Sequence, residues 1–336
     1  MSLEKSQYVR NLKDKEVVAS PFLVKFSSVA VDKNGKPYMN VVLMDSSGEL
    51  EARLWDDVNK HVGQIVRDAF VWVDGKCQSY QGRRQVVINK IQIVREDQVN
   101  VKDYIAEGTL DVDALYAQLM GYVSSMQDPY YKALAESVLR DDADIIDCVK
   151  RAPAAKSVHH AYKGGLLEHV VSITGILDGL SKHYGKYLDR DLLFLGGFFH
   201  DIGKIWELSY DRVTDYTTEG KLIGHLVMGV ELVERKIQAL NASGTLPGLF
   251  PEEKKLLIKH VILAHHGQLE YGSPKRPKCL EALIVHYVDD LDSKVNAIRM
   301  FIEADQNPGK WTGLNRMYER FFFKPDWAQE QEPTIS

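Results

Sequence analysis

The pair His200-Asp201 lies at the end of an apolar run, between Phe199 and Ile202. An imidazole and a carboxylate buried there without partners would carry a large desolvation cost, so a compensating ligand is expected. Imidazole nitrogen and carboxylate oxygen are both metal ligands. The pair therefore predicts a metal ion, and the question becomes which other residues hold it.

Further histidines and aspartates follow apolar runs in the same part of the chain. These candidates are His169, His225, His265-His266, Asp289-Asp290 and Asp292. Taken singly, a histidine on an apolar face is more often a hydrogen-bonded core residue than a ligand. Taken together, they would leave many buried polar groups in need of separate partners, and one metal cluster satisfies all of them. Inward-pointing ligands drawn from separate helices of a bundle are how helical proteins build dinuclear sites.

Composition sets the class of protein that must position these residues. The chain has 336 residues, of which 45% are hydrophobic, and this predicts a soluble globular protein of two domains. No apolar run approaches the ~20 residues that a membrane span needs, and no secretory signal is evident, so a cytoplasmic location without a membrane partner is expected. The net charge of -5 means that nucleic acid must bind in a local groove.

The cysteines are far apart and form no CxxC pair. They are Cys77, Cys148 and Cys279. This spacing argues against a disulfide framework and against a thiolate zinc site, so we expect ordinary buried thiols.

From Glu16 to Val94 the hydrophobic pattern alternates with a period of two, as in β-strands. The segment Asn34-Gly35-Lys36-Pro37 marks a hairpin turn. A short helix is expected at Asp56 to Val62, after the third strand. Five strands with one helix after the third indicate an OB-fold β-barrel.

From about Asp111 the spacing becomes helical, with Leu115, Leu119 and Val123 on one face. We therefore predict a multi-domain α+β protein in which an N-terminal five-stranded OB-fold barrel precedes an all-α helical bundle. The expected divisions are an N-terminal extension (1–15), the barrel (16–95), a charged linker (96–110), the bundle (111–305) and a C-terminal tail (306–336).

The order of His169, His200-Asp201 and Asp289 resembles the HD-domain superfamily of metal-dependent phosphohydrolases, and the additional histidines resemble its dinuclear members. The resemblance implies that Asp201 bridges two ions. The implied ligands of the first ion are His169, His200, Asp201 and Asp289, and those of the second are Asp201, His225, His265 and His266. Asp290 and Asp292 are alternative candidates for the role of Asp289. Alignment with the corresponding helix of the superfamily and the position on the helical face both favour Asp289.

Mixed nitrogen and oxygen ligands suit Mn²⁺, Fe, Co²⁺ or Zn²⁺ better than Mg²⁺. Two such ions lower the pKa of a water and stabilise the charge that develops during phosphodiester hydrolysis. Lys204 follows Asp201 at helical spacing, so its ammonium is expected on the same side. Its two interpretations are a phosphate contact, which the superfamily resemblance favours, and a lysine that complements a helix dipole.

The barrel offers aromatic and cationic candidates for single-stranded nucleic acid. They are Tyr38, Tyr80, Arg83 and Arg84, with Arg53 and Trp55 as further candidates. Trp72 alternates with core positions, so packing is the preferred interpretation for it. Lys275 and Arg276, in a Gly, Ser and Pro loop after His266, are expected to contact the incoming strand or to form a solvated basic loop. A barrel that binds an oligosaccharide or a protein is the alternative, because fold does not fix ligand.

Barrel and bundle in this order resemble the YhaM-type 3′-to-5′ exoribonucleases over roughly Glu16 to Met300. The matching segments are Asn34-Gly35-Lys36-Pro37-Tyr38, His159-His160-Ala161-Tyr162, Gly164-Gly165-Leu166-Leu167-Glu168-His169, His200-Asp201-Ile202-Gly203-Lys204, Tyr216-Thr217-Thr218-x-Gly220 and His265-His266-Gly267-x-x-Glu270-Tyr271-Gly272-Ser273-Pro274. The resemblance implies Mn²⁺- or Co²⁺-assisted removal of nucleotides from the 3′ end of single-stranded RNA or DNA. It also suggests that His159-His160 and Tyr162 line the channel, with a structural helix entry as the alternative.

The sequence is also compatible with two other functions. One is an HD phosphohydrolase that cleaves a nucleotide or a cyclic dinucleotide, although no Gly-Tyr-Pro motif follows His265-His266. The other is a non-catalytic nucleic-acid-binding regulator with a structural metal site. The aromatic segment from Trp311 to Phe323 has two interpretations, a cover for the bundle or a surface for a homo-oligomer.

Overall fold

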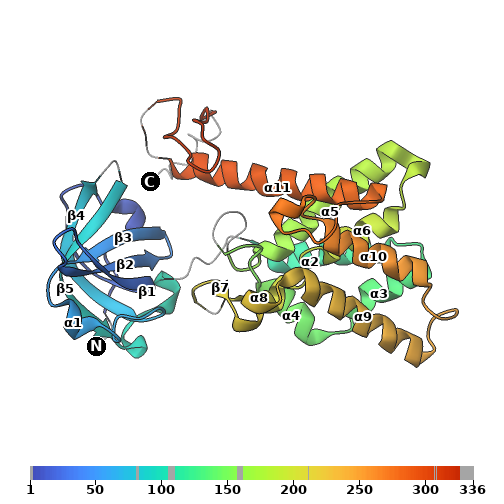
Figure 1. Cartoon of the computed structure of the whole chain (residues 1–336), viewed down its shortest axis with the longest axis horizontal. Coiled ribbons are helices and arrows are strands. Elements are labelled where there is room, and N and C mark those ends of the chain that lie inside the picture. The colour runs from blue at the N-terminus through green and yellow to red at the C-terminus, as the bar shows by residue number, and fades with distance from the viewer. Residues whose placement is uncertain are drawn as a thin grey trace. The chain divides into compact units, whose positions relative to one another are not determined.

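The computed structural model describes residues 3–80, 83–104, 110–156, 162–210, 212–305, 307 and 309–325. The chain divides into two compact units (Figure 1). One holds residues 1–109 with the short segment 211–213, and the other holds residues 110–210 and 214–336. Each unit has its own hydrophobic core.

The first unit is a closed five-stranded barrel in the order β1-β2-β3-β5-β4. A short helix, α1 (Val58–His61), follows the third strand. The strands are β1 (Val17–Val31), β2 (Pro37–Asp45), β3 (Gly48–Leu54), β4 (Phe70–Tyr80) and β5 (Arg83–Val94). All neighbouring pairs are antiparallel except β3 and β5, which run parallel. The predicted OB-fold topology is therefore confirmed.

The alternating pattern of the sequence fills the barrel. Along β2, Met39, Val41 and Leu43 are buried, and their neighbours are more exposed. Side chains of a strand point to opposite faces in turn, so every second residue reaches the barrel interior. The expected turn between the first two strands contains Gly35 with φ of +79°, a left-handed conformation that glycine adopts without strain.

The second unit is predominantly helical. Its helices are α2 (Val112–Ser124), α3 (Pro129–Leu139), α4 (Ala143–Arg151), α5 (Gly165–Tyr184), α6 (Arg190–Phe199), α7 (Lys204–Glu207), α8 (Thr218–Leu222), α9 (His225–Ser243), α10 (Glu252–Ala264) and α11 (Leu280–Ala304). Within the described ranges, no helix has both the length and the apolar character to cross a bilayer.

Aspartates fix where several of these helices begin. Asp111, Asp128, Asp142 and Asp189 are the N-cap residues of α2, α3, α4 and α6, and each side chain accepts a hydrogen bond from a backbone N–H of the first turn. Such caps satisfy donors that have no partner inside the helix. The start of each helix is therefore encoded locally.

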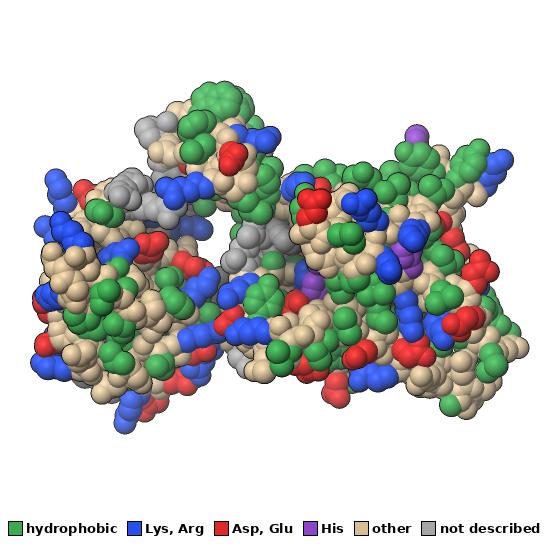
Figure 2. All heavy atoms as spheres, viewed as in Figure 1, with side chains coloured by type: hydrophobic (Ala, Val, Ile, Leu, Met, Phe, Trp, Pro, Cys, Tyr) green, Lys and Arg blue, Asp and Glu red, His purple; other side chains and the backbone are tan. Residues whose placement is uncertain are grey.

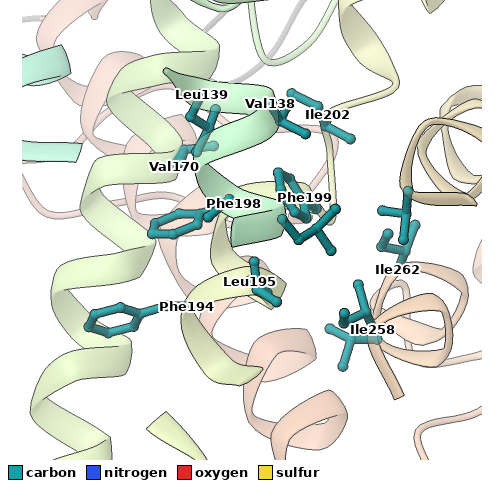
Figure 3. Close-up of a cluster of buried hydrophobic side chains, with 14 of the residues drawn as sticks. Val138, Leu139, Val170, Phe194, Leu195, Phe198, Phe199, Ile202, Ile258 and Ile262 are labelled. Carbon is teal, nitrogen blue, oxygen red and sulfur yellow. The ribbon is translucent and has the colours of Figure 1, made fainter. Parts of the chain in front are cut away.

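Helix α6 runs through the core of the helical unit. Phe194, Phe198 and Phe199 are at most 1% exposed and pack with Ile258 and Ile262 of α10 in one buried cluster (Figure 3). This packing holds the end of α6, and so places His200-Asp201 inside the unit.

The helical unit departs from the all-helical expectation in two places. A two-stranded sheet joins β6 (Leu208–Ser209) to β7 (Asp215–Tyr216). Isolated bridges also link Trp311 to Phe323 and Asn315 to Arg320 in the C-terminal segment. Both elements are too short to show an alternating pattern in the sequence.

Candidate metal centre and nucleic-acid interface

The helical unit brings the predicted ligands together from separate elements. His169 lies on α5, His200-Asp201 follow α6, His225 begins α9, His265-His266 follow α10 and Asp289 lies on α11. Ligand atoms of His169, His200 and Asp201 lie within 4.8 Å of one another, and so do those of His225, His265 and His266. The two triads form one cluster around Asp201, in which His169, His200 and His265 are buried and His225 and His266 are half-buried.

The two carboxylate oxygens of Asp201 face different histidines. Oδ2 lies 3.4 Å from Nε2 of His200 and 3.8 Å from Nε2 of His169. Oδ1 lies 3.5 Å from Nε2 of His225 and 3.6 Å from Nε2 of His265. Asp201 is only 2% exposed. A carboxylate between two sets of imidazoles has the arrangement needed to bridge two ions.

The ring nitrogens that face away from the cluster all have acceptors. Carboxylates accept from two of these Nδ1 atoms, Asp292 from His169 and Glu207 from His225. Backbone carbonyls accept from the other three: Gly196 and Gly197 from His200, Ile262 from His265, and Tyr271 from His266. Bonding to an acceptor places the proton of a neutral imidazole on Nδ1. The Nε2 lone pairs are therefore left for the cluster.

Two buried atoms of the cluster have no hydrogen-bond partner, namely Oδ1 of Asp201 and Nε2 of His225. Oxygen and nitrogen lone pairs that converge in this way repel each other unless a cation lies between them. The donor set therefore fits a divalent metal ion. Imidazole with carboxylate suits Mn²⁺, Fe, Co²⁺ or Zn²⁺ better than Mg²⁺.

The three aspartates on α11 have different surroundings. Oδ1 of Asp289 lies 3.2 Å from Nε2 of His169, inside the cluster. Asp292 instead accepts from Nδ1 of His169 at 2.8 Å and from the Ser172 hydroxyl. Asp290 is paired with Lys294 near the surface. The geometry therefore supports Asp289 as the ligand and gives Asp292 the task of orienting His169.

Lys204 opens α7, and its Nζ lies 2.6 Å from Oδ2 of Asp201. Burial would raise the pKa of Asp201, but Lys204 and His200 together hold this pKa well below its usual value. Burial would likewise lower the pKa of Lys204, but Asp201 keeps it raised. Lys204 therefore keeps its positive charge beside the cluster, with 13% of its side chain exposed.

Burial favours the neutral form of His265 and His266. Desolvation lowers the pKa of His265, and burial together with His265 lowers the pKa of His266 to about 4. Neutral imidazole is the form that binds a metal. In Figure 2, histidine side chains are visible at the surface of the helical unit with Lys or Arg side chains beside them.

Sequence reasoning missed two residues that support the cluster. Glu207 accepts from Nδ1 of His225 at 2.9 Å, and Asp292 was considered only as a competing ligand. The spacing of Asp289 and Asp292 on one helix could have suggested a ligand and its support. Nothing in the sequence singles out Glu207, because its partner His225 is reached only through β6, β7 and α8.

On the barrel, Tyr38 stacks on Trp55, with their ring centroids 4.7 Å apart and an angle of 25° between planes. The Arg53 guanidinium lies 5.5 Å from the centroid of the Tyr38 ring. Stacked aromatic faces beside a cation are what single-stranded nucleic acid binds without sequence preference. Tyr80 is 57% exposed near the end of β4.

Other barrel candidates have different surroundings. Arg84 donates to the carbonyl of Leu12 at 2.6 Å and lies near two neighbouring carbonyls, so it anchors the N-terminal segment to the barrel. That role accounts for Arg84 without nucleic acid. The side chain of Arg83 lies outside the described residues. Trp72 is partly buried against a small core cluster and donates to Asp74, in keeping with the packing interpretation.

The basic loop after His266 is anchored at its base. Ser273 is buried, and its hydroxyl donates to the carbonyls of Leu263 and Lys275. Lys275 and Arg276 are exposed. Tyr162 is half-buried and its hydroxyl donates to Glu168. His159 and His160 lie outside the described residues.

Two known protein domains match separate parts of this chain. Residues 166–294 match the HD domain, and residues 23–94 match the OB-fold nucleic acid binding domain. The curated 3′-5′ exoribonuclease YhaM of Halalkalibacterium halodurans is 34% identical over 316 residues, which cover 94% of this chain and 95% of that protein. The chain belongs to the YhaM family.

The domain matches place the candidate residues of this YhaM family member. The HD match spans all seven proposed metal ligands together with Lys204 and Glu207. The OB-fold match spans Tyr38, Trp55 and Tyr80. The predicted family and fold class are thus confirmed, and the individual ligands remain assignments from geometry.

Solved structures show weaker likenesses. The second OB-fold domain of replication protein A from Methanococcus maripaludis is 14% identical and covers 27% of this chain and 95% of its own, with a TM-score of 0.23. The mitochondrial single-stranded DNA binding protein Rim1 from S. cerevisiae is 12% identical and covers 24% of this chain and 94% of its own, with a TM-score of 0.20. At these TM-scores neither likeness supports an inference about the YhaM family member.

Proposed function

We propose that this protein is a metal-dependent exoribonuclease that hydrolyses single-stranded RNA from the 3′ end and also accepts single-stranded DNA. The observation that carries the proposal is Asp201, whose two oxygens face two sets of imidazoles in one buried cluster. The activity named for the curated relative, which aligns over nearly the whole chain, supports the same reaction.

The proposed cofactor is a pair of divalent ions, with Mn²⁺ as the first choice and Co²⁺, Fe or Zn²⁺ as alternatives. The proposed ligands of one ion are His169, His200, Asp201 and Asp289, and those of the other are Asp201, His225, His265 and His266. Two such ions supply a water of lowered pKa and neutralise charge on the phosphate.

The protein's own groups prepare the substrate. Lys204, whose side chain is 13% exposed, offers a cation to a non-bridging phosphate oxygen next to Asp201. Lys275 and Arg276 are exposed on the loop anchored by Ser273, where they can follow the RNA backbone. The acceptors at Nδ1 keep the imidazoles in one tautomer, so no reorganisation is needed when a substrate enters.

The barrel's proposed task is to hold the polymer. Bases stack on Tyr38 and Trp55, and Arg53 and Tyr80 extend the contact. Stacking is tolerant of sequence, which suits an enzyme that must accept each successive nucleotide. A polymer is therefore preferred over a mononucleotide as substrate.

One experiment separates the proposal from its alternatives. The protein with Mn²⁺ is incubated with 5′-labelled single-stranded RNA, with 5′-labelled single-stranded DNA, with mononucleotides and with cyclic dinucleotides. A ladder that shortens from the 3′ end supports the exonuclease. Cleavage of small nucleotides alone would favour a nucleotide phosphohydrolase, and binding without turnover would favour a regulator.

Truncating the aromatic stack should separate long substrates from short ones. Tyr38→Ala removes one stacking face, so we expect a loss of about 1–3 kcal/mol in RNA binding. The KM for a long single strand should therefore rise about 5- to 150-fold, with the KM for a dinucleotide unchanged. Steady-state kinetics on both substrates measure this. Tyr187→Ala, at a tyrosine that is 67% exposed in the helical unit, is the control, and equal losses on both substrates would contradict the barrel's role.

Self-association is proposed through an apolar stripe on α11. The stripe consists of Leu280, Leu283, Tyr287, Leu291 and Val295, which are between 40% and 62% exposed. Figure 2 shows hydrophobic side chains gathered along the same edge of the helical unit. Contiguous exposed apolar surface of this kind marks an interaction site.

A second copy of the chain is the proposed occupant of this stripe. In an antiparallel pair of α11 helices around a two-fold axis beside Leu291, Tyr287 of one helix meets Val295 of the other. The apolar residues of one helix therefore face the apolar residues of the other, so the stripe can pair with itself.

Leu291→Glu should dissociate this pair, because it buries two like charges at the axis. Light scattering coupled to size exclusion measures the mass at micromolar concentration. Leu256→Glu alters a leucine on α10 that is equally exposed, 57% against 52% for Leu291, and should leave the mass unchanged. A monomeric wild-type protein, or the same mass in both variants, would refute the interface.

A further inference from the structure

Glu207 is a buried carboxylate beside the cluster with no ligand role. Its Oε1 accepts from the backbone N–H of His225 at 3.0 Å and from Nδ1 of the same residue at 2.9 Å. The side chain of Glu207 is 10% exposed and that of His225 is 12% exposed. One oxygen therefore fixes both the backbone and the ring of His225.

We propose that Glu207 is the positioning residue for His225 and so controls the affinity of one of the two ions selectively. This inference rests on the proposed metal assignment, in which His225 serves only the ion shared with His265 and His266. Acceptance by Glu207 keeps the proton on Nδ1 and turns Nε2 toward Asp201, 3.5 Å away.

The segment between Glu207 and His225 is built to hold this contact. The Thr217 N–H donates to the Glu207 carbonyl at 2.9 Å, and the Thr217 hydroxyl accepts from the Gly220 N–H at 2.8 Å. A Cβ at Gly220 would lie 2.2 Å from the Glu207 carbonyl oxygen, so only glycine allows this approach. The segment Tyr216-Thr217-Thr218-x-Gly220 thus packs on the backbone of Glu207 and leads the chain into α9.

The opposite end of the cluster has the same design. Asp292 accepts from Nδ1 of His169 at 2.8 Å, and His169 belongs to the other ion's set. Each proposed ion therefore has one histidine whose Nδ1 is held by a carboxylate. This gives a matched pair of sites, because loss of either carboxylate should affect a different ion.

The hydrogen bonds with His225 keep Glu207 a carboxylate in spite of its burial. Desolvation would raise the pKa of Glu207, but its hydrogen bonds with His225 keep this pKa below the ordinary value. A charged acceptor makes the Nδ1–H bond stronger than a carbonyl would and increases the basicity of Nε2. Glu207, which is not itself a ligand, would therefore act on the metal through the imidazole of His225.

Titration of the full-length, metal-free protein with Mn²⁺ tests the proposal. Glu207→Ala should weaken one of two binding events about 10- to 100-fold and leave the other unchanged. Glu207→Gln retains an oxygen at the position of Oε1 and should recover most of the lost affinity. Asp292→Ala should weaken the other event, so the double variant should weaken both.

The tautomer of His225 gives a readout independent of metal and of activity. Nitrogen-15 spectra of the metal-free protein should show Nδ1–H for His225 in the wild type and in Glu207→Gln, and a shift toward Nε2–H in Glu207→Ala. Unchanged affinity and tautomer in Glu207→Ala would overturn the inference, and so would equal weakening of both ions. If the wild-type protein bound no ion, the proposed function would fail, while the spectra would still judge Glu207.

Discussion

Replacing Asp201 by asparagine should abolish RNA hydrolysis while the protein stays folded. The substitution keeps the volume of the side chain and removes the negative charge that both sets of imidazoles face. It also leaves the largely buried Lys204 ammonium, 2.6 Å away, without its counter-ion. Loss of a carboxylate that merely supports a ligand costs about 10- to 100-fold, so loss of the shared ligand itself should exceed this range.

Single-turnover rates on 5′-labelled RNA with excess Mn²⁺ measure the effect, and calorimetry reports how many ions remain bound. We expect the Asn variant to lose measurable binding of at least one ion. Asp290→Asn is the control, because its carboxylate lies on α11 next to a proposed ligand but is paired with Lys294 near the surface. An Asp201→Asn protein that retained wild-type turnover would remove Asp201 from the centre of the site.

Local patterns were sufficient for the elements that carry the site. Period-two alternation in residues such as Met39, Val41 and Leu43 predicts the barrel, because each strand has one face inside it. The change to helical spacing after Asp111 predicts the bundle. The matches to an OB-fold domain and an HD domain confirm both predictions. These features are visible in the sequence because they repeat over many residues.

Single contacts were not predictable in the same way. Asp289 and Asp292 lie on nearly the same helical face, and only the 3.2 Å and 2.8 Å contacts with opposite nitrogens of His169 separate ligand from support. Arg84 is a second example. Its position near a turn predicts an exposed cation, but in the structure its guanidinium donates to the carbonyl of Leu12. Such roles depend on tertiary contacts between distant segments, and a single tertiary contact leaves no periodic pattern in the sequence.

Gly203 gives the second large expected effect. A Cβ at this position would lie 2.1 Å from the carbonyl oxygen of His225 and 2.8 Å from its carbonyl carbon. Both are backbone atoms, so no side-chain rotation relieves the clash and the first turn of α9 must move. Gly203→Ala should therefore displace His225 from Asp201. A displacement of about 1 Å can cost on the order of 100-fold in rate, and overpacking costs about 1–3 kcal/mol in stability.

Urea unfolding monitored by circular dichroism and RNA hydrolysis rates check the two parts of this expectation. Gly179→Ala is the matched control, because Gly179 lies within α5 and a Cβ there would meet no atom within 4 Å. Alanine in a helix interior is favoured over glycine by about 1 kcal/mol, so the control should be more stable than wild type and equally active. Because Gly203 has φ of -62°, conformational freedom is not what it supplies. If Gly203→Ala had the same stability to urea and the same RNA hydrolysis rate as the wild type, the close approach of Gly203 to His225 would not matter for the site.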